Sequence, residues 1–90
     1  MVETRLQIIN QLGLHARAAA QLVRLAESFK SNIRMERLDK NIVANAKSIL
    51  SVLTLAASFG TQLRLIAEGE DEKVALDAIE KLFTEGFGEL

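Results

Sequence analysis

The residues best suited to chemistry lie at positions 13–17, which read Gly-Leu-His-Ala-Arg. His15 is the only histidine, and it lies where an alternating segment gives way to an alanine-rich helical pattern beginning at Ala16. The first amides of a helix have no partner within the helix, so the N–H groups of Ala16, Arg17 and Ala18 should be free beside the imidazole. Free N–H groups and a guanidinium suit a phosphate. We therefore predict that His15 accepts a phosphoryl group, which Arg17 and these amides hold.

The surroundings of His15 favour a nucleophile. A positive helix end and a nearby guanidinium both disfavour the imidazolium, so the unprotonated ring should be abundant at neutral pH. Gly13 permits a close approach of the backbone before the helix, and the small side chains at 16 and 18–20 leave the ring open to a partner. A lone histidine at a helix start is more often a cap or a surface residue, and only these neighbours favour the phosphoryl acceptor.

Composition excludes several classes of protein. The chain has 90 residues, 49% of them hydrophobic and 26% charged, so we expect one globular domain over residues 1–90. A net charge of −1, with no Trp or Tyr, argues against nucleic-acid binding. With no Cys and a single His, we expect no metal and no cofactor. The first residues lack a long apolar run, so we expect a cytoplasmic monomer that does not insert into a membrane.

Periodicity predicts three strands and a helix in the first half of the chain, then a second helix. Residues 5–9 alternate as a strand and residues 16–30 have helical spacing. Residues 32–38 alternate again, and a polar turn leads to a returning strand at 42–43, as in a hairpin. A second helix is predicted over residues 48–57. The residues expected to face the core of these segments are Leu6, Ile8, Ala19, Leu22, Val23, Ala26, Phe29, Ile33, Met35, Ile49, Val52, Leu53 and Ala56.

The last third of the chain predicts one strand and one helix. Leu63, Leu65 and Ala67 alternate as a strand, and acidic residues 70–72 suit the positive start of a helix. We expect residues 86–88, which include two glycines, to fray. The packing face of the last helix is predicted to be Ala75, Ala78, Ile79 and Leu82. The order β-α-β-β-α-β-α predicts an α+β fold with helices layered on one face of a sheet.

Ser48 and the second helix carry a second candidate site. Ser48 is placed to cap this helix, a role worth about 1 kcal/mol. Leu50 lies off the inner stripe of the helix, and an exposed apolar group can belong to an interface, although a single exposed leucine usually has no such role.

Three motifs, in the same order along the chain, closely resemble the HPr family, the histidine-containing phosphocarriers of the bacterial phosphoenolpyruvate:sugar phosphotransferase system. They are residues 13–17 (GLHAR), 45–50 (NAKSIL) and 67–72 (AEGEDE). The resemblance implies an open-faced two-layer sandwich: a four-stranded antiparallel sheet in the order 1-4-2-3 with three helices on one face. It also implies that His15 takes phosphate on Nδ1 from enzyme I and passes it to a IIA component, with Arg17 stabilising the phosphate.

The resemblance extends to partners and to one departure. Ser48 matches the serine that HPr kinase phosphorylates in many bacteria. Ile49, Leu50 and Leu53 match an apolar docking patch, and Arg24 and Lys47 would give it a basic rim for acidic partners. The family usually has proline directly after the arginine, whereas this chain has Ala18. Alanine restores a backbone donor in the first turn.

A sugar-uptake carrier has two alternatives. An independent enzyme would need a nucleophile, a metal cluster or paired carboxylates beside His15, and the sequence offers none that is convincing. A regulatory or nitrogen-branch relative, which signals by its phosphorylation state instead of driving sugar uptake, stays open. Ser48 favours the sugar branch weakly.

Overall fold

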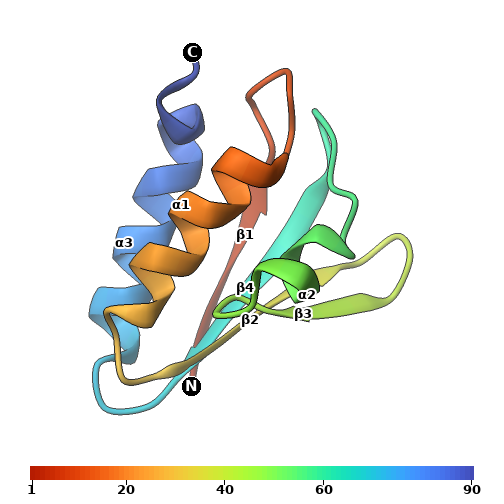
Figure 1. The fold of residues 1–90 in the computed structure, drawn as a ribbon. Helices are drawn as coiled ribbons and strands as arrows, with labels where there is room; N and C mark the ends of the chain where they lie inside the picture. The colour runs from red at the N-terminus through yellow and green to blue at the C-terminus, as the bar shows by residue number, and fades with distance from the viewer.

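The computed structural model describes all 90 residues as an antiparallel sheet covered on one face by helices (Figure 1). The strands lie in the order β1-β4-β2-β3, which confirms the predicted topology. The predicted order of elements is also confirmed, with a short 3₁₀ helix added at the end. The elements are β1 (Val2–Gln7), α1 (Ala16–Glu27), β2 (Asn32–Arg37), β3 (Ile42–Asn45), α2 (Ile49–Leu53), β4 (Gln62–Glu68), α3 (Glu72–Thr84) and η1 (Gly86–Gly88).

The sheet is built by strands whose apolar residues alternate. Leu6 on β1 lies opposite Leu63 on β4, and Met35 on β2 lies opposite Leu65. These four side chains are buried under the helices. The other face of the sheet carries charged side chains, among them Arg64, which lies 3.5 Å from Glu3 and 3.2 Å from Glu36. One face of the sheet is therefore apolar and covered, and the other is polar.

The helices complete the core from one side. In Figure 1, α1 and α3 run beside each other across the sheet, and α2 packs against α1. The buried residues of α1 are Ala18, Ala19, Leu22, Val23 and Ala26. Four of these five were predicted from the helical spacing. No helix has the length and apolar character that crossing a membrane requires.

The second helix is shorter than predicted, and its inner stripe is partly wrong. It ends at Leu53, not near residue 57, because Ala56 adopts a left-handed conformation (φ 48°) that a helix does not tolerate. The chain then carries Leu55 into the core. Val52 is the only residue of the helix that is buried, while Ile49 and Leu53 are exposed. Likewise α1 ends at Glu27 instead of residue 30.

The end of the chain also differs from the prediction. In α3 the buried residues are Ala75, Leu76, Ile79 and Phe83, whereas Ala78 and Leu82 are only half-buried. Residues 86–88 do not fray but form the 3₁₀ helix η1, and Phe87 is 4% exposed. Its ring packs against Phe83. Burial of this aromatic side chain holds the last turn on the body of the protein.

Candidate functional site

His15 caps the start of α1. Its backbone is extended (φ −73°, ψ 177°), its carbonyl accepts from the N–H of Ala19 at 2.8 Å, and its side-chain Nδ1 accepts from the N–H of Arg17 at 3.2 Å. An accepting Nδ1 carries a lone pair, so the neutral ring bears its proton on Nε2. The structure therefore confirms that His15 lies at a helix start, and the hydrogen bond from Arg17 N–H indicates that Nδ1 is the unprotonated nitrogen.

The first turn of α1 has two free backbone donors. The N–H groups of Ala16 and Ala18 have no hydrogen-bond acceptor, as the first amides of a helix lack one within the helix. Arg17 N–H, in contrast, is used by His15 Nδ1. The backbone donors predicted for an anion are thus beside the imidazole, and the alanine at position 18 adds one that a proline would lack.

The loop before the helix is held tightly. Gly13 has a φ of +69°, and a Cβ on it would lie 2.6 Å from the carbonyl oxygen of Ala57. Leu14 N–H donates to that same oxygen at 2.9 Å, and the side-chain amide of Asn10 donates to the carbonyl of Gly13 at 2.9 Å. The close approach predicted for Gly13 is confirmed, and it fixes the direction in which the chain enters α1.

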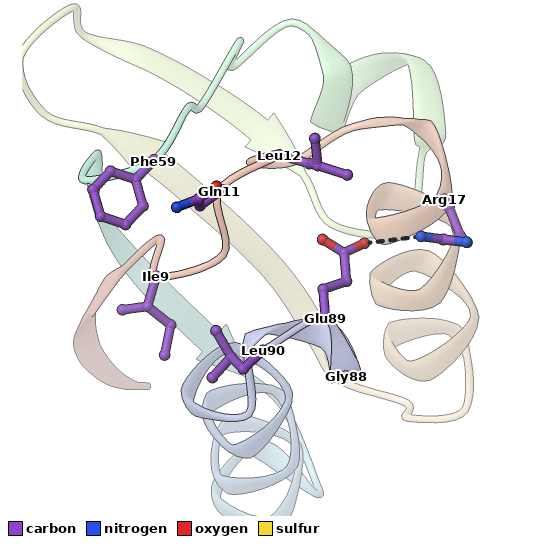
Figure 2. A pocket seen from close by; sticks show the side chains of 8 residues that line it. All are labelled: Ile9, Gln11, Leu12, Arg17, Phe59, Gly88, Glu89 and Leu90. Atoms are coloured by element: carbon purple, nitrogen blue, oxygen red, sulfur yellow. Dashed lines mark hydrogen bonds and ion pairs between the residues drawn. The ribbon is translucent and has the colours of Figure 1, made fainter.

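Glu89 is the site residue that sequence reasoning missed. Its carboxylate contacts His15 Nε2 and lies 3.5 Å from Arg17 Nη2, a pair drawn in Figure 2. Asn10 Nδ2 donates to its other oxygen at 2.9 Å. Hydrogen bonds from Asn10 and His15, with a further one from Arg17, hold the pKa of Glu89 below its usual range. An anion therefore faces the ring, a partner that the prediction of an uncharged imidazole did not include.

Apolar side chains surround this group. Figure 2 shows Ile9, Leu12, Phe59 and Leu90 around a hollow that Arg17 and Glu89 also line. Each of the four apolar residues is at least 37% exposed. Exposed apolar side chains therefore lie beside the ion pair of Arg17 and Glu89.

Ser48 caps α2, as predicted. Its Oγ accepts from the N–H of Ser51 at 3.2 Å, and the Oγ of Ser51 accepts from the N–H of Asn45 at 2.8 Å. Asn45 Oδ1 accepts from Lys47 N–H at 2.9 Å. These bonds tie the end of β3 to the start of α2, so Ser48 sits in a segment with a defined backbone.

The residues predicted to dock partners are unequal in exposure. Leu50 is 79% exposed, Ile49 42% and Leu53 36%, so the three apolar side chains of α2 do face outward. Arg24 is exposed in the last turn of α1. Lys47 is half-buried and its ammonium donates to the carbonyl of Phe29 at 2.8 Å. Its charge is therefore placed at the end of α1 and partly used there.

The structure brings together no group of three or more His, Cys, Asp or Glu residues that could hold a metal ion. The one histidine interacts with a single carboxylate and with backbone. The chemistry available at the site is that of an imidazole whose unprotonated Nδ1 accepts from Arg17 N–H, a guanidinium and two free amides, which together suit an anionic group.

Comparison with known proteins agrees with this geometry. The family model described as "PTS HPr component phosphorylation site" matches residues 2–85. The chain is 45% identical over 89 residues to the phosphocarrier protein HPr of Xylella fastidiosa strain Temecula1, covering 99% of this chain and 98% of that one. Two solved structures, both from Thermoanaerobacter tengcongensis, are similar.

The first, HPr-C-His, has a TM-score of 0.94 and 42% identity, covering 100% of this chain and 99% of that one. The second is described as an HPr dimer and has a TM-score of 0.78 and 43% identity, covering 99% of this chain and 100% of that one. Sequence, fold and helix-capping histidine lead to one conclusion: the chain belongs to the HPr family of phosphocarrier proteins of the phosphotransferase system.

Proposed function

We propose that His15 accepts a phosphoryl group on Nδ1 from enzyme I, which derives it from phosphoenolpyruvate, and passes it to IIA components of sugar transport. The observation that carries this proposal is the start of α1, where Nδ1 has a lone pair beside the free N–H groups of Ala16 and Ala18. Family membership supports the same role.

The hydrogen bond from Arg17 N–H to His15 Nδ1 can be replaced directly by hydrogen bonds to the phosphoryl group. When the Nδ1 lone pair forms a bond to phosphorus, the bond from phosphorus to the donor breaks, and Nδ1 can no longer accept from Arg17 N–H. The N–H of Arg17 and the free N–H groups of Ala16 and Ala18 can then donate to the phosphoryl oxygens. The guanidinium of Arg17, which is 69% exposed, can turn to the same oxygens.

The proposed docking surface consists of Ile49, Leu50 and Leu53, with Arg24 and Lys47 at its rim. Support comes from the outward apolar side chains of α2 and from the packing of α2 against α1. A carrier must release both its donor and its acceptor, so a small, transient interface suits this role. The acidic partners proposed are enzyme I and IIA domains.

Ser48 is proposed as a regulatory site for an HPr kinase/phosphorylase. Its position beside Ile49 and Leu50 means that a phosphate there would add about 1.5 to 2 negative charges to the docking surface. A regulatory or nitrogen-branch role remains the second candidate, and the presence of Ser48 favours the sugar branch. We also propose that the protein works in the cytoplasm as a monomer, a point that sedimentation of the purified chain tests.

Incubation with enzyme I and ³²P-phosphoenolpyruvate tests the carrier role. We expect label on the wild type that is lost in acid, as phosphohistidine is and phosphoserine is not. His15→Ala should take no label, whereas Ser48→Ala should take as much as the wild type. Addition of a IIA domain should move the label to that domain. A wild-type chain that takes no label, or acid-stable label on His15→Ala, would contradict the proposal.

A further inference from the structure

Both nitrogens of the His15 imidazole make hydrogen-bonded contacts. Nδ1 accepts from the N–H of Arg17 at 3.2 Å, and Nε2 meets the carboxylate of Glu89. A ring nitrogen that accepts is unprotonated and one that faces a carboxylate is protonated. The two contacts therefore select the same tautomer, with the proton on Nε2 and the lone pair on Nδ1.

Glu89 is itself held in place. Asn10, which is 1% exposed, donates from its side-chain amide both to Glu89 and to the carbonyl of Gly13. The Glu89 side chain is 13% exposed, and Phe87, two residues earlier, is buried. A carboxylate fixed in this way orients the ring that it contacts, as the partners of metal-bound and catalytic histidines do.

We infer that Glu89 is a positioning residue for His15, and that its carboxylate keeps the proton on Nε2 both before phosphoryl transfer and in the phosphorylated ring. The inference rests on the proposed function, since it concerns the reactivity of phosphorylated His15.

The step balances without moving a proton. The Nδ1 lone pair forms the N–P bond while the bond from phosphorus to the donor breaks, and the ring, still protonated on Nε2, becomes a cation. The carboxylate of Glu89 faces that positive charge. When the acceptor attacks phosphorus, the N–P bond breaks, its electron pair returns to Nδ1, and the neutral ring is restored. A ring that loses the Nε2 proton is a poorer leaving group, so Glu89 keeps the phosphoryl group transferable.

Few charged groups influence the protonation of the His15 ring. Glu89, after η1, is the ionisable side chain in contact with the ring, and the guanidinium of Arg17 on α1 is in contact with Glu89. Neither the loop of residues 8–14 nor α2 has an ionisable side chain. Arg17 opposes a cationic ring and Glu89 favours it. Once the phosphoryl group draws the guanidinium away, Glu89 remains as the counter-charge of the ring.

The test compares wild type, Glu89→Gln and Glu85→Gln. Glutamine removes the charge at position 89 while keeping its size, and Glu85 is an exposed carboxylate four positions earlier that makes no contact with His15. Each protein is phosphorylated with enzyme I and phosphoenolpyruvate, and the release of phosphate is followed between pH 5 and pH 9. Ring ¹⁵N resonances of the unphosphorylated proteins are titrated by NMR in parallel.

We expect the midpoints of both pH profiles to move to lower pH by roughly one unit in Glu89→Gln, the size of shift that an opposite charge in contact produces. Glu85→Gln should follow the wild type. Unchanged midpoints in Glu89→Gln would overturn the inference, and so would an equal shift in Glu85→Gln. If the wild type takes no phosphate, the proposed function fails, while the ¹⁵N titration still decides the part played by Glu89.

Discussion

Phe83 and Phe87 meet edge to face, with ring centroids 4.9 Å apart and planes at 64°. Phe83 lies in the last turn of α3 and Phe87 lies in η1, so this contact fastens η1, and with it Glu89, to the body of the protein. Aromatic pairs of this geometry contribute about 0.5–1.5 kcal/mol beyond the burial of their area.

Phe87→Ala should therefore lower the free energy of unfolding by about 3–5 kcal/mol, the usual cost of removing a buried phenyl ring. Urea denaturation measures it. Phe59→Ala is the control, because Phe59 is 62% exposed, and it should change stability by no more than about 0.5 kcal/mol. Equal effects of the two substitutions would show that the last turn is not anchored by Phe87.

Gly13→Ala should destabilise the protein by about 1–3 kcal/mol through backbone strain, and further through the close approach of its Cβ to the carbonyl oxygen of Ala57. Gly60→Ala separates the two causes, since Gly60 also has a positive φ (+88°) but nothing within 4 Å of its Cβ position. Gly13→Ala should have a lower midpoint temperature of thermal unfolding (Tm) than Gly60→Ala. Equal destabilisation by the two substitutions would mean that Gly13 is needed only for its backbone angle.

Asp71 should make stability depend on acid. The Ser31 hydroxyl and the Lys30 N–H donate to its carboxylate and lower its pKa from 3.8 to about 2. A carboxylate with a lowered pKa stabilises the folded state above its unfolded value of 3.8, and this contribution is lost as the pH falls toward 2.

Asp71→Asn should accordingly show a smaller loss of unfolding free energy between pH 6 and pH 2 than the wild type. Urea titrations at the two pH values measure the difference. Asp77→Asn, which removes an exposed carboxylate from the same helix, should keep most of the wild-type loss. If Asp71→Asn also kept it, the bonds from Ser31 and Lys30 would not stabilise the fold.

Ser48 allows capping and regulation to be separated. Ser48→Ala removes the acceptor for Ser51 N–H and should cost about 1 kcal/mol of stability while leaving affinity for enzyme I unchanged. Ser48→Asp keeps an acceptor and adds a charge, so stability should hold while affinity falls. Calorimetric titration with enzyme I checks the second point, and full affinity in Ser48→Asp would argue against regulation at this position.

Leu50→Gln tests the docking surface. Because Leu50 is 79% exposed, the change should alter stability by no more than about 0.5 kcal/mol. Loss of an interface anchor costs more than about 1 kcal/mol of binding, or roughly fivefold in Kd for enzyme I. Val74→Gln, on α3 and 63% exposed, is the matched control and should bind as the wild type does. Equal Kd values for the two variants would remove Leu50 from the interface.

The sequence predicted the fold class and the start of α1 because both depend on local patterns. Alternation of Leu63, Leu65 and Ala67 and the change of period at Ala16 are visible within short windows. The end of α2 was missed for the opposite reason. Ala56 and Ala57 continue a helical pattern, but the chain leaves the helix after Leu53 so that Leu55 can be buried, a tertiary effect that outweighs local propensity.

Half of the site was predictable in the same way. His15 and Arg17 are close in sequence, and a helix start brings them together in any fold. Glu89 lies 74 positions from His15, and the glycines at 86 and 88 made its segment read as a frayed end. The burial of Phe87 against Phe83 and the hydrogen bond from Asn10 to Glu89 give that segment a fixed place, and neither is visible in the local sequence pattern.

The strand order joins β1 to β2 only through β4, whose residues 62–68 come late in the chain. The residues before position 62 therefore contain His15 but neither the strand that joins the two halves of the sheet nor the carboxylate of Glu89 that contacts the imidazole.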